Sequence, residues 1–154
     1  MLLDAFRDIE QFNYIKVECP IPMRKMREII KRTDGKLLCY NGNGGIFAID
    51  AFISGATGIM PGALLAGEFA EMTKTFESGN LEEARDKFEK ILPLAWYEDQ
   101  SLEFYVACEK CGETLDKFLL KEIGVIKSDT VRKPGVQLTD FEKEELLNLY
   151  KRLK

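Results

Sequence analysis

The stretch Tyr14-Ile15-Lys16-Val17-Glu18 decides how this chain is organised. Its β-branched and aromatic residues favour a short strand, and Pro22 then stands where the first turn of a helix with an apolar face begins. The alternation continues with a strand at 36–40, a helix at 46–54 and a strand at 57–60. Strands that alternate with helices over such short connections are typical of parallel βα units.

Helical periodicity lies on both sides of these strands. Upstream, residues 2–12 have the spacing of an amphipathic helix. Two capping pairs, Asn80 with Glu83 and Thr139 with Glu142, mark helix starts downstream. The downstream helices are predicted at 65–78, at 81–92, at 102–123 with a weak point at Gly112, and from 139 to the end of the chain.

Composition excludes several classes of function. The 154-residue chain has a net charge of -4 and no basic run with interleaved aromatics, so we expect no nucleic-acid partner. No apolar stretch approaches the roughly 20 residues that span a bilayer, and the start lacks a signal-peptide layout, so we expect a cytoplasmic protein with no membrane partner. The absence of histidine leaves lysine, tyrosine, cysteine and carboxylates for chemistry.

Lys16 stands inside an otherwise apolar strand. It is either an edge-strand lysine whose stem packs while its ammonium reaches water, or an amine shielded from water that attacks a ketone and forms an imine. Glu18 is two residues further on, so both side chains would point to the same side of the strand. Glu18 is therefore expected to pair with Lys16 or a neighbour, or to form an ordinary rim salt bridge.

Several stretches, taken in order, resemble the dihydrodipicolinate synthase / N-acetylneuraminate lyase family of Schiff-base aldolases. Residues 14–18 resemble its sixth barrel strand, 37–44 its seventh strand and following turn, 55–60 its eighth strand, and 80–94 its C-terminal helical region. The resemblance implies an α/β fold, the C-terminal part of a (β/α)8 TIM barrel. Residues 1–63 would supply strands six to eight, and residues 64–154 the last barrel helix and the C-terminal helical region.

The same resemblance assigns roles to three residues. Lys16 would be the catalytic, imine-forming lysine. Gly42 would bind substrate by letting its carbonyl group approach the backbone, and Met60 would lie at the edge of the substrate site. The resemblance implies pyruvate or another 2-oxo acid as the small-molecule partner, and we predict neither a cofactor nor a metal ion.

Part of the family's catalytic machinery has no counterpart in this sequence. Members usually bring paired threonines and a Tyr-Asn-x-Pro tyrosine from the first five strands, and neither motif occurs here. Three parallel strands also cannot close a barrel. We therefore expect a fragment, a split protein or a self-associating piece, whose partner is the missing N-terminal barrel segment or a second copy. We predict little or no lyase activity for this chain alone.

Other interpretations stay open. The chain could be a catalytically inactive module for protein interaction or oligomerisation. Cys108-x-x-Cys111 would allow a metal or redox site, but the sequence has no second such pair and no histidine to complete a ligand set. Trp96, Tyr97 and Tyr105 are interpreted as helix packing. The substrate within the family is also open: dihydrodipicolinate synthesis, sialic-acid cleavage, and cleavage or dehydration of 2-keto-3-deoxy sugar acids all remain possible.

Overall fold

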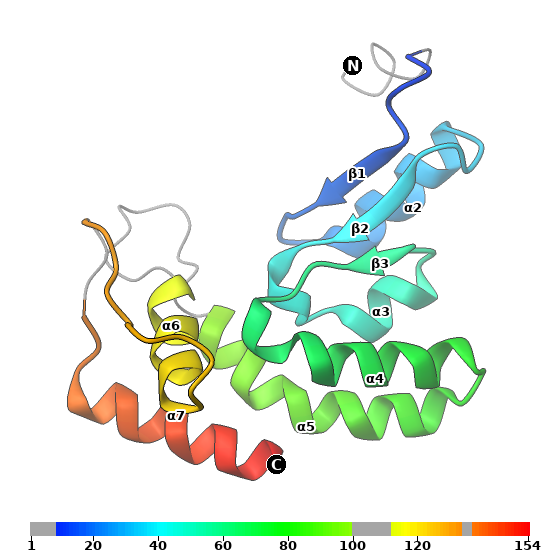
Figure 1. Cartoon of the computed structure of the whole chain (residues 1–154). Helices are drawn as coiled ribbons and strands as arrows, with labels where there is room; N and C mark the ends of the chain where they lie inside the picture. Colours follow the sequence, from blue (N-terminus) through cyan, green and yellow to red (C-terminus); the bar gives the residue numbers. More distant parts are fainter. Residues whose placement is uncertain (1–8, 100–111, 134–136) are drawn as a thin grey trace. The chain divides into compact units, whose positions relative to one another are not determined.

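The computed structural model describes residues 9–99, 112–133 and 137–154 (Figure 1). The chain divides into two compact units, Met1–Pro61 and Gly62–Lys154, and each is described by itself. Among the described residues, no helix has both the length and the apolar character needed to cross a membrane.

The first unit is a parallel three-stranded sheet in the order β1-β2-β3 with helices between the strands. This confirms the predicted βα alternation. Its elements are β1 (Tyr14–Val17), α2 (Pro22–Arg32), β2 (Leu38–Asn41), the short 3-10 helix η1 (Asn43–Gly45), α3 (Ala48–Ile53) and β3 (Gly58–Ile59).

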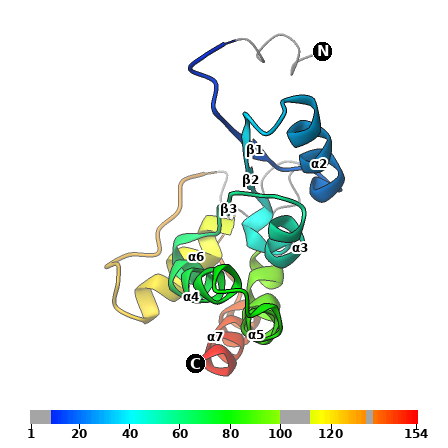
Figure 2. The same ribbon diagram turned by 90° about the vertical axis from the view of Figure 1, so that its right-hand side faces the viewer.

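Helices α2 and α3 lie on the same side of the sheet (Figure 2). The core of the unit lies there, and its buried members come from β1, α2, β2 and α3 together with the residue before β2: Val17, Met26, Ile29, Leu37, Cys39 and Ala51. Because side chains alternate along a strand, the neighbours of Val17 and Cys39 point to the opposite face. That face carries apolar side chains with substantial exposure, namely Tyr14 (59%), Leu38 (37%) and Met60 (49%).

The second unit is helical, with the short 3-10 helix η2 (Ala63–Leu65), α4 (Ala66–Glu77), α5 (Leu81–Asp99), α6 (Gly112–Glu122) and α7 (Asp140–Leu153). Helix α4 packs along α5, and α5 also contacts α6 and α7. Buried apolar side chains from all four helices and η2 form its interior, among them Leu65, Phe69, Met72, Ile91, Leu94, Leu119 and Leu146.

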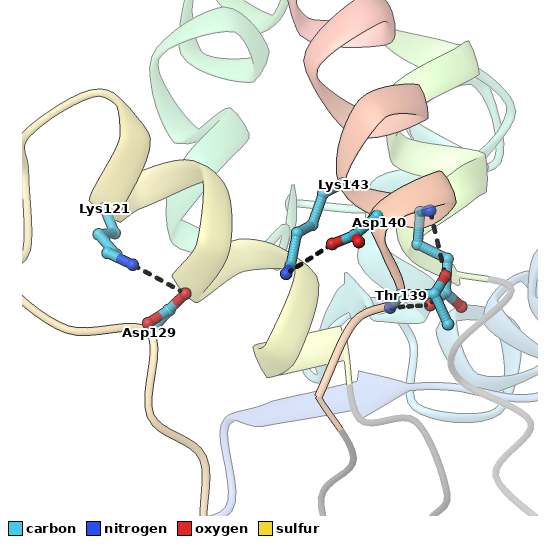
Figure 3. A network of polar contacts seen from close by, with 6 residues as sticks. Lys121, Asp129, Thr139, Asp140 and Lys143 are labelled. Carbon is cyan, nitrogen blue, oxygen red and sulfur yellow. Dashed lines mark hydrogen bonds and ion pairs between the residues drawn. The ribbon is translucent and has the colours of Figure 1, made fainter.

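Both predicted capping pairs are present. Thr139 Oγ1 accepts a hydrogen bond from the Glu142 backbone N–H at 3.3 Å, and Glu142 Oε2 accepts one from the Thr139 backbone N–H at 2.8 Å (Figure 3). Ion pairs flank this cap, Lys143 with Asp140 and Lys121 with Asp129. Asn80 accepts from the Glu83 backbone N–H in the same way at the start of α5.

Two helix predictions differ from the structure. Helix α5 continues through Pro93 to Asp99, whereas the sequence pattern predicted its apolar face only as far as residue 92. Proline removes one backbone hydrogen bond, but Pro93 is exposed, and Ile91 and Leu94 beside it are buried in the core. Burial on that face thus keeps the helix continuous. Residues 9–12 of the predicted first helix form a turn, closed by Phe12 N donating to Ile9 O.

Candidate functional site

The residues predicted for the site lie at the carboxyl ends of the three strands. Lys16 is the third residue of β1, Gly42 follows β2 directly, and Met60 follows β3 directly. Parallel strands bring their carboxyl ends to one edge of a sheet, which is where barrel and open α/β enzymes place their chemistry. The fold therefore places Lys16, Gly42 and Met60 along one edge of the sheet.

The register of the sheet also puts them on one face. Lys16 is the Cα partner of Tyr40, and Tyr40 is the partner of Gly58. Residues in register on neighbouring strands share a face, and so do residues two apart on one strand. This is the face that α2 and α3 leave uncovered.

Lys16 and Glu18 form a close ion pair. Lys16 Nζ lies 2.6 Å from Glu18 Oε2, and the side chains are 47% and 27% exposed. Of the alternatives considered from the sequence, the structure shows the pairing of Glu18 with Lys16. The Lys16 side chain is therefore about half exposed even though its Nζ is paired.

The backbone of Gly42 packs against this pair. Gly42 N donates to Val17 O at 3.0 Å, which fixes the turn after β2 beside the end of β1. A Cβ atom at position 42 would lie 2.7 Å from Lys16 Cε, 2.8 Å from Glu18 Oε2 and 2.9 Å from Glu18 Cβ. Only glycine fits this contact unless the neighbours move. The structure therefore brings Lys16, Glu18 and Gly42 together.

Met60 lies further along the edge. Its backbone N–H donates to Asn41 O at 2.9 Å, and its side chain is 49% exposed. Strand β2 stands between Met60 and Lys16, which corresponds to about 10 Å at the usual strand spacing. Met60 borders the Lys16 region without joining the ion pair.

Sequence reasoning did not single out Tyr40 or Asn41 as site residues. The Tyr40 ring covers Gly58, where a Cβ atom would lie 2.7 Å from Tyr40 Cε1, and its centroid is 6.0 Å from that of Tyr14. Asn41 is fully buried on the helix-covered face, and neither atom of its amide group has a hydrogen-bond partner among the described residues. The two-residue period of β2 separates these faces, but only the register shows that Tyr40 lies beside Lys16.

The described residues show no second chemical centre in this unit. Cys19 and Cys39 are free thiols, and burial raises the pKa of Cys39. Within the described part of the chain, no group of three metal-ligating side chains gathers. Cys108, Cys111 and Tyr105 lie outside the described residues. On α5, Tyr97 is half-buried and Trp96 is 50% exposed, so Trp96 is packed less than predicted.

Comparisons with known proteins identify the family of the chain. The dihydrodipicolinate synthetase family matches residues 8–153. L-2-keto-3-deoxyarabonate dehydratase of Azospirillum brasilense is 30% identical over 149 residues, which cover 96% of this chain and 45% of that protein.

Solved structures show the same relationship. Dihydrodipicolinate synthase of Rhodopseudomonas palustris is 30% identical with a TM-score of 0.77, covering 90% of this chain and 45% of that one. The structure of a putative dihydrodipicolinate synthetase from Pseudomonas aeruginosa has the same fold, with a TM-score of 0.84 at 23% identity, covering 99% of this chain and 49% of that one. The chain thus spans about half the length of the relatives it matches. With its parallel βα units and C-terminal helices, the chain belongs to the dihydrodipicolinate synthetase family.

Proposed function

We propose that this chain carries the imine-forming lysine of a Schiff-base lyase or aldolase, and that this lysine is Lys16. The substrate class is pyruvate or a related 2-oxo acid. In this proposal, residues 1–63 supply the sixth to eighth strands of the barrel and residues 64–154 the helices that follow. Gly42 and Met60 border the substrate.

One observation carries the proposal. Lys16 is an amine at the carboxyl end of a parallel strand, on the uncovered face of the sheet, against the backbone of a glycine that a side chain could not replace without displacement. An amine placed there can reach the carbonyl carbon of a substrate that binds on this face. The alternative is a structural lysine whose ammonium group reaches water. It explains why the Lys16 side chain is 47% exposed, but it gives no reason for the close packing of Gly42 against that side chain.

Dehydration of a 2-keto-3-deoxy sugar acid is supported within this class by the Azospirillum brasilense relative. That protein is named as a dehydratase of L-2-keto-3-deoxyarabonate and is 30% identical to this chain. An imine at the 2-oxo carbon acidifies the protons on the adjacent carbon, and loss of one of them precedes elimination of a hydroxyl group. Cleavage or formation of a carbon–carbon bond uses the same intermediate.

The exposure of Lys16 supports low activity for the chain alone. The Lys16 side chain is 47% exposed, whereas an enclosed site excludes water and holds the substrate in position against the amine. This chain covers 45% to 49% of its relatives, and in this proposal the remaining part supplies the strands that enclose Lys16. We propose that full activity needs that remaining part of the barrel.

Complementation tests this proposal. The purified chain is assayed for loss of L-2-keto-3-deoxyarabonate, alone and mixed with the part of the Azospirillum brasilense dehydratase that it does not match. We expect little turnover alone, turnover in the mixture, and none with Lys16→Ala; Lys25→Ala, an exposed lysine of α2, is the matched control. Sustained turnover by the chain alone, or an active Lys16→Ala mixture, would contradict the proposal.

A second candidate is a catalytically inactive interaction module. The uncovered face favours this second function because it exposes three apolar side chains, those of Tyr14, Leu38 and Met60. Exposed apolar surface of this kind is stabilised when a partner covers it. The two functions predict the same binding to a complementing segment and differ in the chemistry at Lys16. Association without any Lys16-dependent turnover would favour the module.

A further inference from the structure

We infer that Glu18 is the acid–base group of the Lys16 site: it takes a proton from the Lys16 ammonium and returns it to the departing oxygen of the substrate. This inference rests on the proposed function, because it gives Glu18 a role only if Lys16 forms an imine. It deepens that function by assigning a proton carrier within the chain itself.

Geometry supports the assignment first. Glu18 Oε2 is 2.6 Å from Lys16 Nζ, within the reach that proton transfer requires. Glu18 directly follows β1 at its carboxyl end, on the same face as Lys16. Both side chains pack directly against Gly42, since a Cβ there would meet Lys16 Cε, Glu18 Oε2 and Glu18 Cβ at less than 3.0 Å. The carboxylate thus lies beside the atom that reacts.

The proton balance suits a carboxylate that begins and ends ionised. Glu18 accepts one proton from the Lys16 ammonium, which frees the nitrogen lone pair. The nitrogen then attacks the carbonyl carbon, and the C–O double bond becomes a single bond. A second nitrogen proton and the one held by Glu18 move to the oxygen, which leaves as water. The products are an iminium ion, water and the original carboxylate, so no outside acid, base or oxidant is consumed.

The small contribution of an exposed ion pair to stability allows a chemical role of Glu18 to be distinguished from a structural one. Ion pairs with solvent-exposed partners contribute little to stability, and both side chains here reach solvent. Loss of the pair should leave the fold largely unchanged. General acid–base groups, in contrast, contribute about 100- to 10,000-fold in rate, so a chemical role and a structural one differ strongly in size.

Other titratable groups on this face are less well placed. Tyr14 and Tyr40 share the face with Lys16. The Tyr40 ring, however, packs over Gly58 and against the ring of Tyr14, with the two ring centroids 6.0 Å apart. Among the described residues, Glu18 forms an ion pair with Lys16 Nζ. It is therefore the group whose removal should alter proton transfer.

The test uses the full chain complemented by the part of the Azospirillum brasilense dehydratase that it does not match. It measures how fast pyruvate and cyanoborohydride label Lys16 in this assembly, from about pH 4 to pH 8, for wild type, Glu18→Gln and Glu18→Asp. We expect labelling at Lys16 to slow at least roughly tenfold in Glu18→Gln and to recover in part in Glu18→Asp. We also expect the pH profile of labelling in Glu18→Gln to differ from that of wild type. Glu28→Gln removes an exposed ion-paired carboxylate from α2 and is the control expected to behave as wild type. Circular dichroism checks that each variant is folded.

The outcomes separate the two claims. Absence of any Lys16 label in the wild type contradicts the proposed function and this inference with it. Labelling of the wild type with an equal rate and an equal pH profile in Glu18→Gln contradicts the inference alone. A uniform slowing at all pH values, with no change of profile and no recovery in Glu18→Asp, also overturns it, because the pair would then only position Lys16.

Discussion

Because residue 42 is a glycine, its backbone can pack directly against the Lys16–Glu18 ion pair. Gly42 is buried between the ends of β1 and β2, and its backbone contacts both members of the Lys16–Glu18 pair. The ends of the Lys16 and Glu18 side chains can rotate away from an added methyl group, but Glu18 Cβ cannot, because it is bonded directly to the backbone. That backbone is fixed next to Gly42, since the neighbouring Val17 O accepts a hydrogen bond from Gly42 N–H. The contact therefore links the turn after β2 to the geometry of the pair.

Gly42→Ala is expected to displace Lys16 and Glu18. Added atoms in a packed site cost typically about 1–3 kcal/mol, and we expect a loss of unfolding free energy in that range together with a severalfold slower labelling of Lys16. Urea denaturation and the labelling assay measure the two effects. Gly67→Ala is the matched control, because a Cβ there meets nothing within 4 Å on helix α4 and should leave both values unchanged or raise stability slightly. Equal behaviour of the two variants would contradict the packing account.

At the scale of elements, the start of α7 depends on a reciprocal cap. Thr139 and Glu142 satisfy one another's backbone N–H groups. Thr139→Ala removes the side-chain acceptor, and we expect it to lower the free energy of unfolding by about 0.5–2 kcal/mol. Thr139→Ser keeps the hydroxyl group and should stay close to wild type in the same denaturation experiment. If alanine and serine destabilise alike, the cap is not the cause.

The contact between α5 and α6 carries a buried acid. Burial, the charge of Asp116 and a hydrogen bond to Asp116 raise the pKa of Glu98 from 4.5 to about 9. The folded chain therefore keeps a proton that the unfolded chain releases above about pH 4.5. Stability must fall as the pH rises from that value toward 9, because the unfolded state binds fewer protons over this range.

Glu98→Gln should remove this dependence, since an amide does not ionise. We expect the variant to be more stable than wild type at about pH 8 and similar to it near pH 5, as measured by urea midpoints across the range. Glu71→Gln serves as the control: hydrogen bonding to and the charge of Lys74 lower the pKa of Glu71, so it is ionised throughout and should not change the slope. A wild-type slope retained in Glu98→Gln would contradict the assignment.

At the scale of the whole molecule, the sequence predicts a good part of the fold and less of the site. The strands, their parallel order and the two caps follow from local patterns: β-branched runs, short connections and Thr-x-x-Glu spacing. The pairing of Glu18 with Lys16 follows from the strand period. The contact of Gly42 with that pair does not, because it depends on the register of Val17 against Asn41, which tertiary packing sets.

Polar contacts between residues far apart in the chain could also not be predicted from the sequence pattern. Glu98 and Asp116 belong to separate helices, and no local spacing brings two carboxyl groups together. The passage of α5 through Pro93 has the same origin, since burial of Ile91 and Leu94 outweighs a local helix-breaking preference. Local rules describe elements well, and packing decides where those rules give way.

The uncovered face of the sheet gives a prediction for assembly. Met60 is 49% exposed, so Met60→Asp should change the stability of the isolated chain by less than about 0.5 kcal/mol. It should weaken binding to the complementing part of the Azospirillum brasilense relative, because that face would be covered in the assembly. Ile53→Asp, 51% exposed on α3, is the control expected to bind normally. Isothermal titration calorimetry measures the affinity of wild type, Met60→Asp and Ile53→Asp for the complementing segment. Equal affinities of wild type and Met60→Asp would show that this segment does not cover the face that carries Met60.

The central claim concerns a single covalent bond, between Lys16 and a 2-oxo acid. The most direct measurement is peptide mapping by tandem mass spectrometry after the complemented assembly is treated with pyruvate and cyanoborohydride. We predict a reduced pyruvate adduct on the peptide that holds Lys16, at Lys16 itself, and no adduct in Lys16→Ala. A folded, complemented assembly with no adduct, or with the adduct on another lysine of this chain, would contradict the account.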